Sequence, residues 1–174
     1  MTSEPVKAEL PKSPNSLRLT LWVLLIVYIF NFLDRQIVNI LAEPISRDLG
    51  LSDTQIGLMT GIAFAAFYTF LGIPIARYAD RPKTNRVGLI SVSLIIWSGM
   101  TALCGVAQNF VQLLLARIGV GVGEAGCTPA AHSLIADLAP PEKRASAISF
   151  YSLGIPIGSL LGMVIGGLVA DAYG

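Results

Sequence analysis

The sequence is poor in charged residues, and this scarcity excludes a large class of proteins. Asp, Glu, Lys and Arg make up only 13% of the 174 residues, whereas soluble globular domains carry about 25%. So few charges cannot coat a water-facing surface of this size, which excludes a soluble domain. The net charge is +1 and no basic cluster with interleaved aromatic residues occurs, so nucleic acid is not expected as a partner.

Cysteine and histidine are also scarce, which limits metal and redox chemistry. Cys104 and Cys127 both fall within apolar runs, so we expect no disulfide between them. One histidine and two distant thiols supply too few ligands for a metal site. The sequence also lacks a nucleophile–base pair and a phosphate-binding loop. It therefore predicts neither an enzyme nor a cofactor.

Long hydrophobic runs are what the sequence has instead. Hydrophobic residues account for 53% of the chain and gather in five runs, each long enough to cross a bilayer as a helix. The runs show no sustained alternation of period two, which favours helices over barrel strands. We predict an all-α membrane protein with about five transmembrane helices. The predicted spans are 18–42, 54–76, 87–107, 111–137 and 145–170.

The connections between the runs carry signals for helix starts and stops. The Glu43-Pro44 pair is predicted to stop the first helix. Ser52 and Gln55 have the spacing of a capping box for the second. Pro141 suits the start of the fifth, because proline is tolerated in a first helical turn.

Positive charges are distributed unevenly between the two predicted sides of the membrane. Residues 1–16, rich in proline, are predicted to form a disordered tail. Nine lysine and arginine residues lie on the side of this tail, against Arg47 alone on the other. These nine are Lys7, Lys12, Arg18, Arg77, Arg81, Lys83, Arg86, Lys143 and Arg144. Because basic loops stay in the cytoplasm, we predict a multi-pass cell-membrane protein with a cytoplasmic amino terminus.

An odd number of spans is unusual for a transporter-like architecture. Transporter halves are commonly built from two inverted triplets of helices, and here the second triplet would stop after its second member. We therefore expect part of a six-helix half, with a missing carboxyl-terminal portion encoded by the same gene or carried by a separate chain. A genuine five-helix protein is the alternative.

Ionisable residues within the predicted spans are the strongest functional signal. The four are Asp34, Arg35, Arg117 and Glu124. Charge in the hydrocarbon region is expensive, so each needs a partner or a cavity. Arg117 and Glu124 are seven residues apart, close to two turns, and share one helix face. Packing of the first span on the fourth would gather all four into one buried cluster, with Asn31 beside it.

This predicted cluster has two interpretations. In the functional one, a carboxylate exchanges a proton in step with alternating access, and the arginines hold its charge or an anionic substrate. In the structural one, the four residues form a static network that only fixes helix packing. The expense of charge in the membrane favours the functional interpretation.

Small residues and one histidine complete the candidates. The stretch 121–126 matches G-x-G-x-x-G but lies inside a membrane helix, so it does not predict a dinucleotide site. Its small residues let a neighbouring backbone approach closely. The candidate packing glycines are Gly121, Gly154, Gly158 and Gly162. His132 has either a titrating role or a packed, carbonyl-bonded ring, and we interpret it as packed.

Together these residues resemble the major facilitator superfamily. Asp80 and Arg81, in the loop between the second and third spans, are similar to its D-R loop signature. Arg117 with Gly121 and Gly123 is similar to its R-x-x-x-G-x-G signature in the fourth helix. Three strings further resemble bacterial Spinster-like transporters, namely 31–36, 72–76 and 121–126.

The resemblance implies the amino-terminal part of a major facilitator fold, with a gating role for Asp80 and Arg81. It implies proton-linked transport of an organic solute that is amphipathic or anionic, and lysolipid-like in the Spinster proteins. The expected partners are therefore the lipid bilayer, such a solute and protons. The likeness to bacterial members implies a bacterial inner membrane. The alternative is a non-transporting membrane fragment or one subunit of a split transporter.

Overall fold

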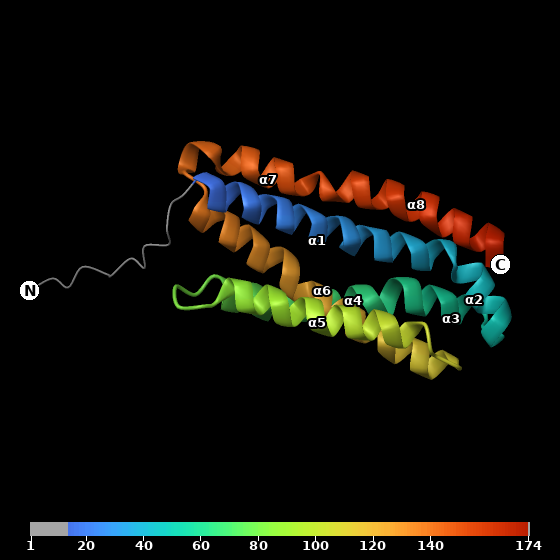
Figure 1. Cartoon of the computed structure of the whole chain (residues 1–174). Coiled ribbons are helices and arrows are strands. Elements are labelled where there is room, and N and C mark those ends of the chain that lie inside the picture. The colour runs from blue at the N-terminus through green and yellow to red at the C-terminus, as the bar shows by residue number, and fades with distance from the viewer. Residues whose placement is uncertain (1–13, 174) are drawn as a thin grey trace, which may run out of the picture.

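The structure, a computed structural model, describes residues 14–173, and these are helical apart from short turns (Figure 1). The helices are α1 (Pro14–Ile40), α2 (Ala42–Leu49), α3 (Asp53–Gly57), α4 (Ala63–Ala79), α5 (Arg86–Cys104), α6 (Phe110–Leu138), α7 (Arg144–Ser152) and α8 (Gly154–Tyr173). A π-helical turn, Leu58–Ile62, joins α3 to α4, and a 3-10 turn, Pro141–Lys143, precedes α7. Most of the predicted tail lies outside the described residues.

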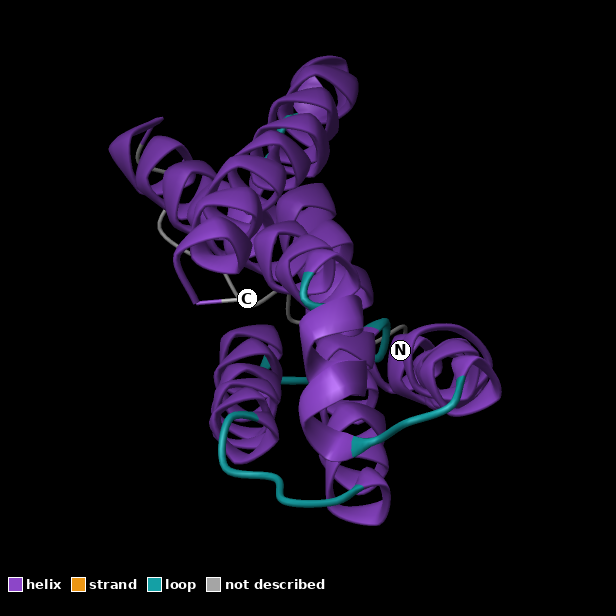
Figure 2. Cartoon of the chain, turned by 90° about the vertical axis from the view of Figure 1, so that its right-hand side faces the viewer, coloured by secondary structure: helices purple, strands orange, loops and turns teal. Residues whose placement is uncertain are grey.

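Five helical stretches in the described range are long and apolar enough to cross a membrane, which confirms the predicted fold class. They are α1, the continuous run from α3 through α4, α5, α6, and the run from the 3-10 turn through α8. Figure 2 shows the same helices from their ends, connected by short loops.

Helix boundaries follow local signals, with one difference from the prediction. Ser52 Oγ accepts from the Gln55 N–H at 3.3 Å and the Gln55 side chain accepts from the Ser52 N–H at 2.9 Å, which confirms the capping box. The first helix, however, ends at Ile40, and Pro44 lies in the first turn of α2 instead of stopping α1. Proline fits there because the first turn needs no N–H donor from it.

The helices form two packed groups. In one, α1 lies along α7 and α8; in the other, α6 packs against α4 and α5. Helix α6 crosses the bundle diagonally in Figure 1, and its sparse contacts with α1 and α7 join the two groups. It is also the most enclosed span, with 56% of its apolar stretch buried against 11–22% for the other four.

Glycines allow the close approaches within both groups. The three candidates on α8 all face α1, namely Gly154, Gly158 and Gly162. A Cβ added at Gly162 would lie 2.7 Å from Gln36 Cβ and 2.9 Å from the Leu33 carbonyl oxygen. On α6, a Cβ at Gly121 would lie 3.3 Å from the Phe64 ring of α4. Larger residues at these positions would therefore push the helices apart.

Candidate functional site

Four charged side chains form two ion pairs where α1 crosses α6. Arg35 donates from Nε to Glu124 Oε2 at 2.8 Å, and its Nη2 lies 2.6 Å from the same oxygen. Arg117 Nη1 lies 3.6 Å from Asp34 Oδ2. The structure thus brings together all four residues that the sequence placed in one cluster, and pairs each arginine with a carboxylate of the other helix.

The pairing follows from helix geometry. Asp34 and Arg35 are consecutive on α1, so their side chains point about 100° apart around the helix. Arg117 and Glu124 lie on one face of α6, two turns apart. Asp34 and Arg35 therefore leave α1 in two directions. Asp34 reaches the turn of α6 that carries Arg117, and Arg35 reaches the turn that carries Glu124.

The two helices contribute unequally to the burial of the site. On α6, the side chain of Glu124 is fully buried and that of Arg117 is 4% exposed, whereas on α1 Asp34 is 14% and Arg35 27% exposed. Within residues 14–173, Arg117 Nε and Nη1 and Glu124 Oε1 have no hydrogen-bond partner. The cluster therefore balances its charge while keeping buried donors and an acceptor able to bind more.

Aromatic rings enclose both guanidinium groups. Arg35 Cζ lies 5.4 Å from the ring centre of Phe32, and 4.9 Å from those of Phe64 and Tyr68. Arg117 Cζ lies 5.3 Å from the ring centre of Phe64. Cations over aromatic faces are stabilised by the ring quadrupole. The rings therefore give both arginines contacts in addition to those with their carboxylate partners.

Helix α5 supplies hydrogen-bond donors to the second pair. Trp97 Nε1 and Thr101 Oγ1 each donate to Asp34 Oδ2 at 3.4 Å. The sequence interpretation missed both residues. The available signal was two hydrogen-bond donors four residues apart on an apolar span, which places them on one face of the helix. Asn31 is buried one turn before Asp34, at 4% exposure.

The candidate gating residues lie away from this cluster. Asp80 and Arg81 are exposed at the end of α4. An ion pair at this end of the bundle involves neither of them. Arg86 Nη1 lies 2.5 Å from Asp137 Oδ2, and this pair connects the start of α5 to the end of α6. The sequence interpretation missed this pair, for which opposite charges at the ends of two consecutive spans were the only signal.

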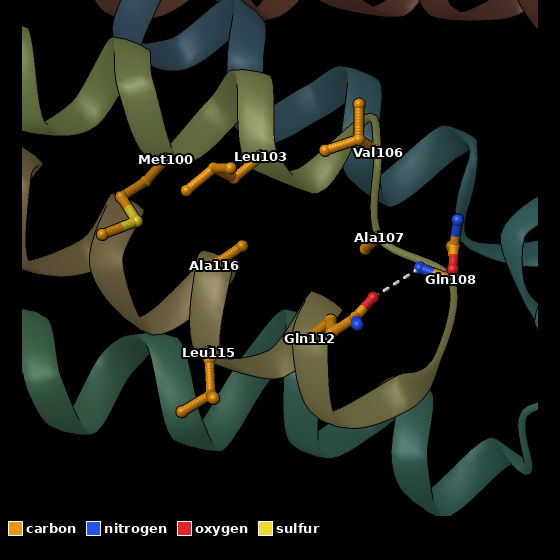
Figure 3. A pocket seen from close by; sticks show the side chains of 8 residues that line it. All are labelled: Met100, Leu103, Val106, Ala107, Gln108, Gln112, Leu115 and Ala116. Atoms are coloured by element: carbon orange, nitrogen blue, oxygen red, sulfur yellow. Dashed lines mark hydrogen bonds between the residues drawn. The ribbon is translucent and has the colours of Figure 1, made fainter.

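A groove of about 530 Å³ opens between α5 and α6 near the loop that joins them (Figure 3). Its walls are mostly apolar and include Met100 and Leu103, and Gln112 accepts from the Gln108 N–H at 2.9 Å at its end. None of the four charged residues lines it. The groove is therefore separate from the charged cluster.

Comparison with known proteins extends these observations. Residues 24–174 match the model of the Major Facilitator Superfamily. The chain is 41% identical over 152 residues to an MFS-type efflux pump of Mycolicibacterium smegmatis, which covers 87% of this chain and 35% of that protein. It is 29% identical over 148 residues to a sphingosine-1-phosphate transporter of Danio rerio, covering 84% of this chain and 29% of the relative.

A solved structure agrees with the fold. A bacterial homologue of the human lysosomal transporter Spinster, in an inward-facing and occupied conformation, superposes with a TM-score of 0.86 at 47% identity. The match covers 91% of this chain and 34% of that one, so the chain spans about a third of the length of its relatives. These relatives are membrane transporters and not enzymes. The chain belongs to the Major Facilitator Superfamily and is similar to the amino-terminal part of its Spinster proteins.

Proposed function

We propose that this chain forms the amino-terminal part of a proton-linked secondary transporter that moves an amphipathic or anionic organic solute by alternating access. The observation that supports this proposal most directly is the pair of a fully buried glutamate with a partly exposed arginine inside a membrane bundle. The name of one relative, a sphingosine-1-phosphate transporter, agrees with such a solute.

The proposed first step is the protonation of Glu124. Its carboxylate is buried in a membrane span, where a charge is tolerated only because Arg35 balances it. A proton that binds Oε1, the oxygen without a hydrogen-bond partner, makes the group neutral. Arg35 then loses its counter-charge but keeps its contacts with the stacked rings of Phe64 and Tyr68.

The proposed second step is the binding of an anionic group by Arg35. A guanidinium offers several N–H donors in a fixed plane that suits carboxylates and phosphates. The proton and the anion favour each other's binding, because the proton removes the carboxylate that competes with the anion for Arg35. Such coupling is reciprocal. A lysolipid-like solute would place its headgroup here and its chain along apolar surface.

The orientation and the gating loop belong to the same proposal. The excess of basic residues on one side supports a cytoplasmic amino terminus, in a bacterial inner membrane. On that side, Asp80 and Arg81 are exposed and so available to contact the rest of a transporter when it closes. Their proposed role is to stabilise one end state of the alternating-access cycle.

A second candidate is a non-transporting fragment or one subunit of a split transporter. The observation in its favour is that the chain spans about a third of its relatives. Expression of the chain alone and together with a carboxyl-terminal portion distinguishes the two. Solute movement only in the second case indicates a subunit, and movement in neither case indicates a fragment.

The proton step can be tested in the chain itself, because it has two tryptophans and one of them touches the cluster. Trp22→Phe removes the exposed one and leaves Trp97, whose Nε1 lies 3.4 Å from Asp34. We expect Trp97 fluorescence to titrate with pH, Glu124→Gln to abolish that titration, and the exposed control Glu142→Gln to leave it unchanged.

Transport tests the same carboxylates in the assembled protein. With the carboxyl-terminal portion present, Asp34→Asn and Glu124→Gln should each abolish uptake of a lysophospholipid driven by a pH gradient. Normal uptake rates in both variants would show that these carboxylates do not couple protons to transport.

A further inference from the structure

Helix α6 carries a second set of polar side chains that the proposed site does not use. Thr128 and His132 follow Glu124 at intervals of four residues, slightly more than one turn each. This spacing places Thr128 about 6 Å and His132 about 12 Å along the helix from Glu124, toward its end at Leu138. Each step also turns the side chain by about 40°, so the three residues form a slowly winding stripe.

Burial decreases steadily along this stripe. Glu124 is fully buried, Thr128 is half-buried and His132 is exposed. The histidine is therefore not enclosed as the sequence suggested, because it is exposed and its ring makes an edge contact with Tyr151. The stripe leads from the sealed carboxylate to an open surface.

Two tyrosines lie beside Thr128 and His132 on this stripe. Tyr28 of α1 stacks on Tyr151 of α7, with ring centres 4.3 Å apart. The His132 ring meets Tyr151 edge-on at 5.4 Å. Both phenol groups interact with the Thr128 side chain. Each of these three hydroxyl groups can donate one hydrogen bond and accept another, which is what a proton relay requires.

The surroundings of His132 leave it able to gain and lose a proton. The titratable group in contact with His132 is the Tyr151 phenol, and the Tyr28 phenol stacks on Tyr151. Cys127 and Tyr68 also interact electrostatically with Tyr151, and Arg35 with Tyr28. Among residues 14–173, no recorded ion pair includes His132. No fixed counter-charge therefore holds the imidazole in one protonation state.

We propose that His132, Thr128 and the two tyrosines form the proton route to Glu124 from the side on which α1 begins. This inference rests on the proposed function, since it takes Glu124 to be the proton acceptor. His132 takes a proton from hydronium on one ring nitrogen and releases one from the other. Each hydroxyl accepts one proton and donates one, and the Glu124 carboxylate becomes the neutral acid. One proton moves, and nothing is oxidised or reduced.

The rate of protonation, not its extent, tests this route. The whole chain carrying Trp22→Phe is placed in lipid nanodiscs, and Trp97 fluorescence is followed after a rapid drop in pH. His132→Gln should slow the signal about 100-fold, the lower end of what a positioned proton-transfer group contributes. The amplitude and the equilibrium midpoint should stay unchanged, and imidazole added to the buffer should restore the rate.

Further variants separate the route from its alternatives. Thr128→Val keeps the shape of the side chain and removes its hydroxyl, so it should slow the signal even if His132→Gln disturbs packing. Ser91→Ala, exposed on α5, is the control and should have no effect. Unchanged rates in both the His132 and Thr128 variants would overturn the route while leaving Glu124 as acceptor. A signal that persists in Glu124→Gln would instead overturn the proposed function.

Discussion

Arg35 and Glu124 differ in exposure: the side chain of Arg35 is accessible and that of Glu124 is enclosed. Arg35 keeps 27% of its side chain exposed, whereas Glu124 is completely buried. A carboxylate sealed in this way can change its charge only by exchanging a proton. The exposed arginine can meet a solute from outside the bundle. The same bond thus connects the residue proposed to bind the proton with the residue proposed to bind the anion.

The strength of this pair can be measured by removing its partners one at a time. Arg35→Gln should lower the free energy of unfolding by about 3–5 kcal/mol, because it leaves a buried charge without a partner. Adding Glu124→Gln should recover part of that loss, since the uncompensated charge is then gone. Unfolding in mixed micelles with increasing SDS gives the free energies of unfolding of the original chain, the two single variants and the double variant. Strictly additive losses would mean that the two side chains do not interact.

At the level of helices, the molecule combines two tight contacts with one sparse junction. Glycines bring α8 against α1 and bring α6 against its neighbours α4 and α5. The two groups meet through α6 and through side-chain contacts of α1 with α4 and α5, and both buried ion pairs lie at that junction. A change of charge at Glu124 therefore acts at the junction that joins the two groups.

The close contact of α8 with α1 predicts opposite effects for two similar substitutions. Gly162→Ala should destabilise the protein by about 1–3 kcal/mol, because the added methyl group overpacks against Gln36 and Leu33. Gly167→Ala is the matched control, since its added Cβ would have nothing within 4 Å. It should be neutral or stabilise by up to about 1 kcal/mol, because alanine favours a helix. Thermal unfolding in detergent compares the two, and equal shifts would contradict the close contact.

Over the whole molecule, the five spans place the charged loops on alternate sides. The loop between α4 and α5 and the turn before α7 lie at the end where α1 begins, and α2 and α3 lie at the other (Figure 1). This arrangement agrees with the alternation from which the cytoplasmic amino terminus was predicted.

Single cysteines can test that orientation. With Cys104→Ala and Cys127→Ala as background, Lys83→Cys and Asp53→Cys place one thiol at each end, both at exposed positions. A membrane-impermeant maleimide added to intact cells should label the Asp53 variant and should label the Lys83 variant only after the cells are opened. The reverse pattern would place the amino terminus outside.

Features that depend on composition and local spacing were predictable from the sequence. The apolar runs yield the five spans because any 20 or so such residues cross a bilayer as a helix. The capping box of Ser52 and Gln55 forms within one turn. The four intramembrane charges were identifiable because their cost demands partners wherever the helices lie. The end of α1 was missed, because a proline is compatible with both a stop and a first turn.

Features that join distant segments required the folded structure. Which arginine meets which carboxylate, the rings of Phe64 and Tyr68 around Arg35, and the pair of Arg86 with Asp137 all depend on how each helix is rotated and where it crosses its neighbours. His132 looked like a packed residue until its exposure and its contact with Tyr151 were visible. Periodicity tells which residues share a face of one helix, but packing between helices selects what that face meets.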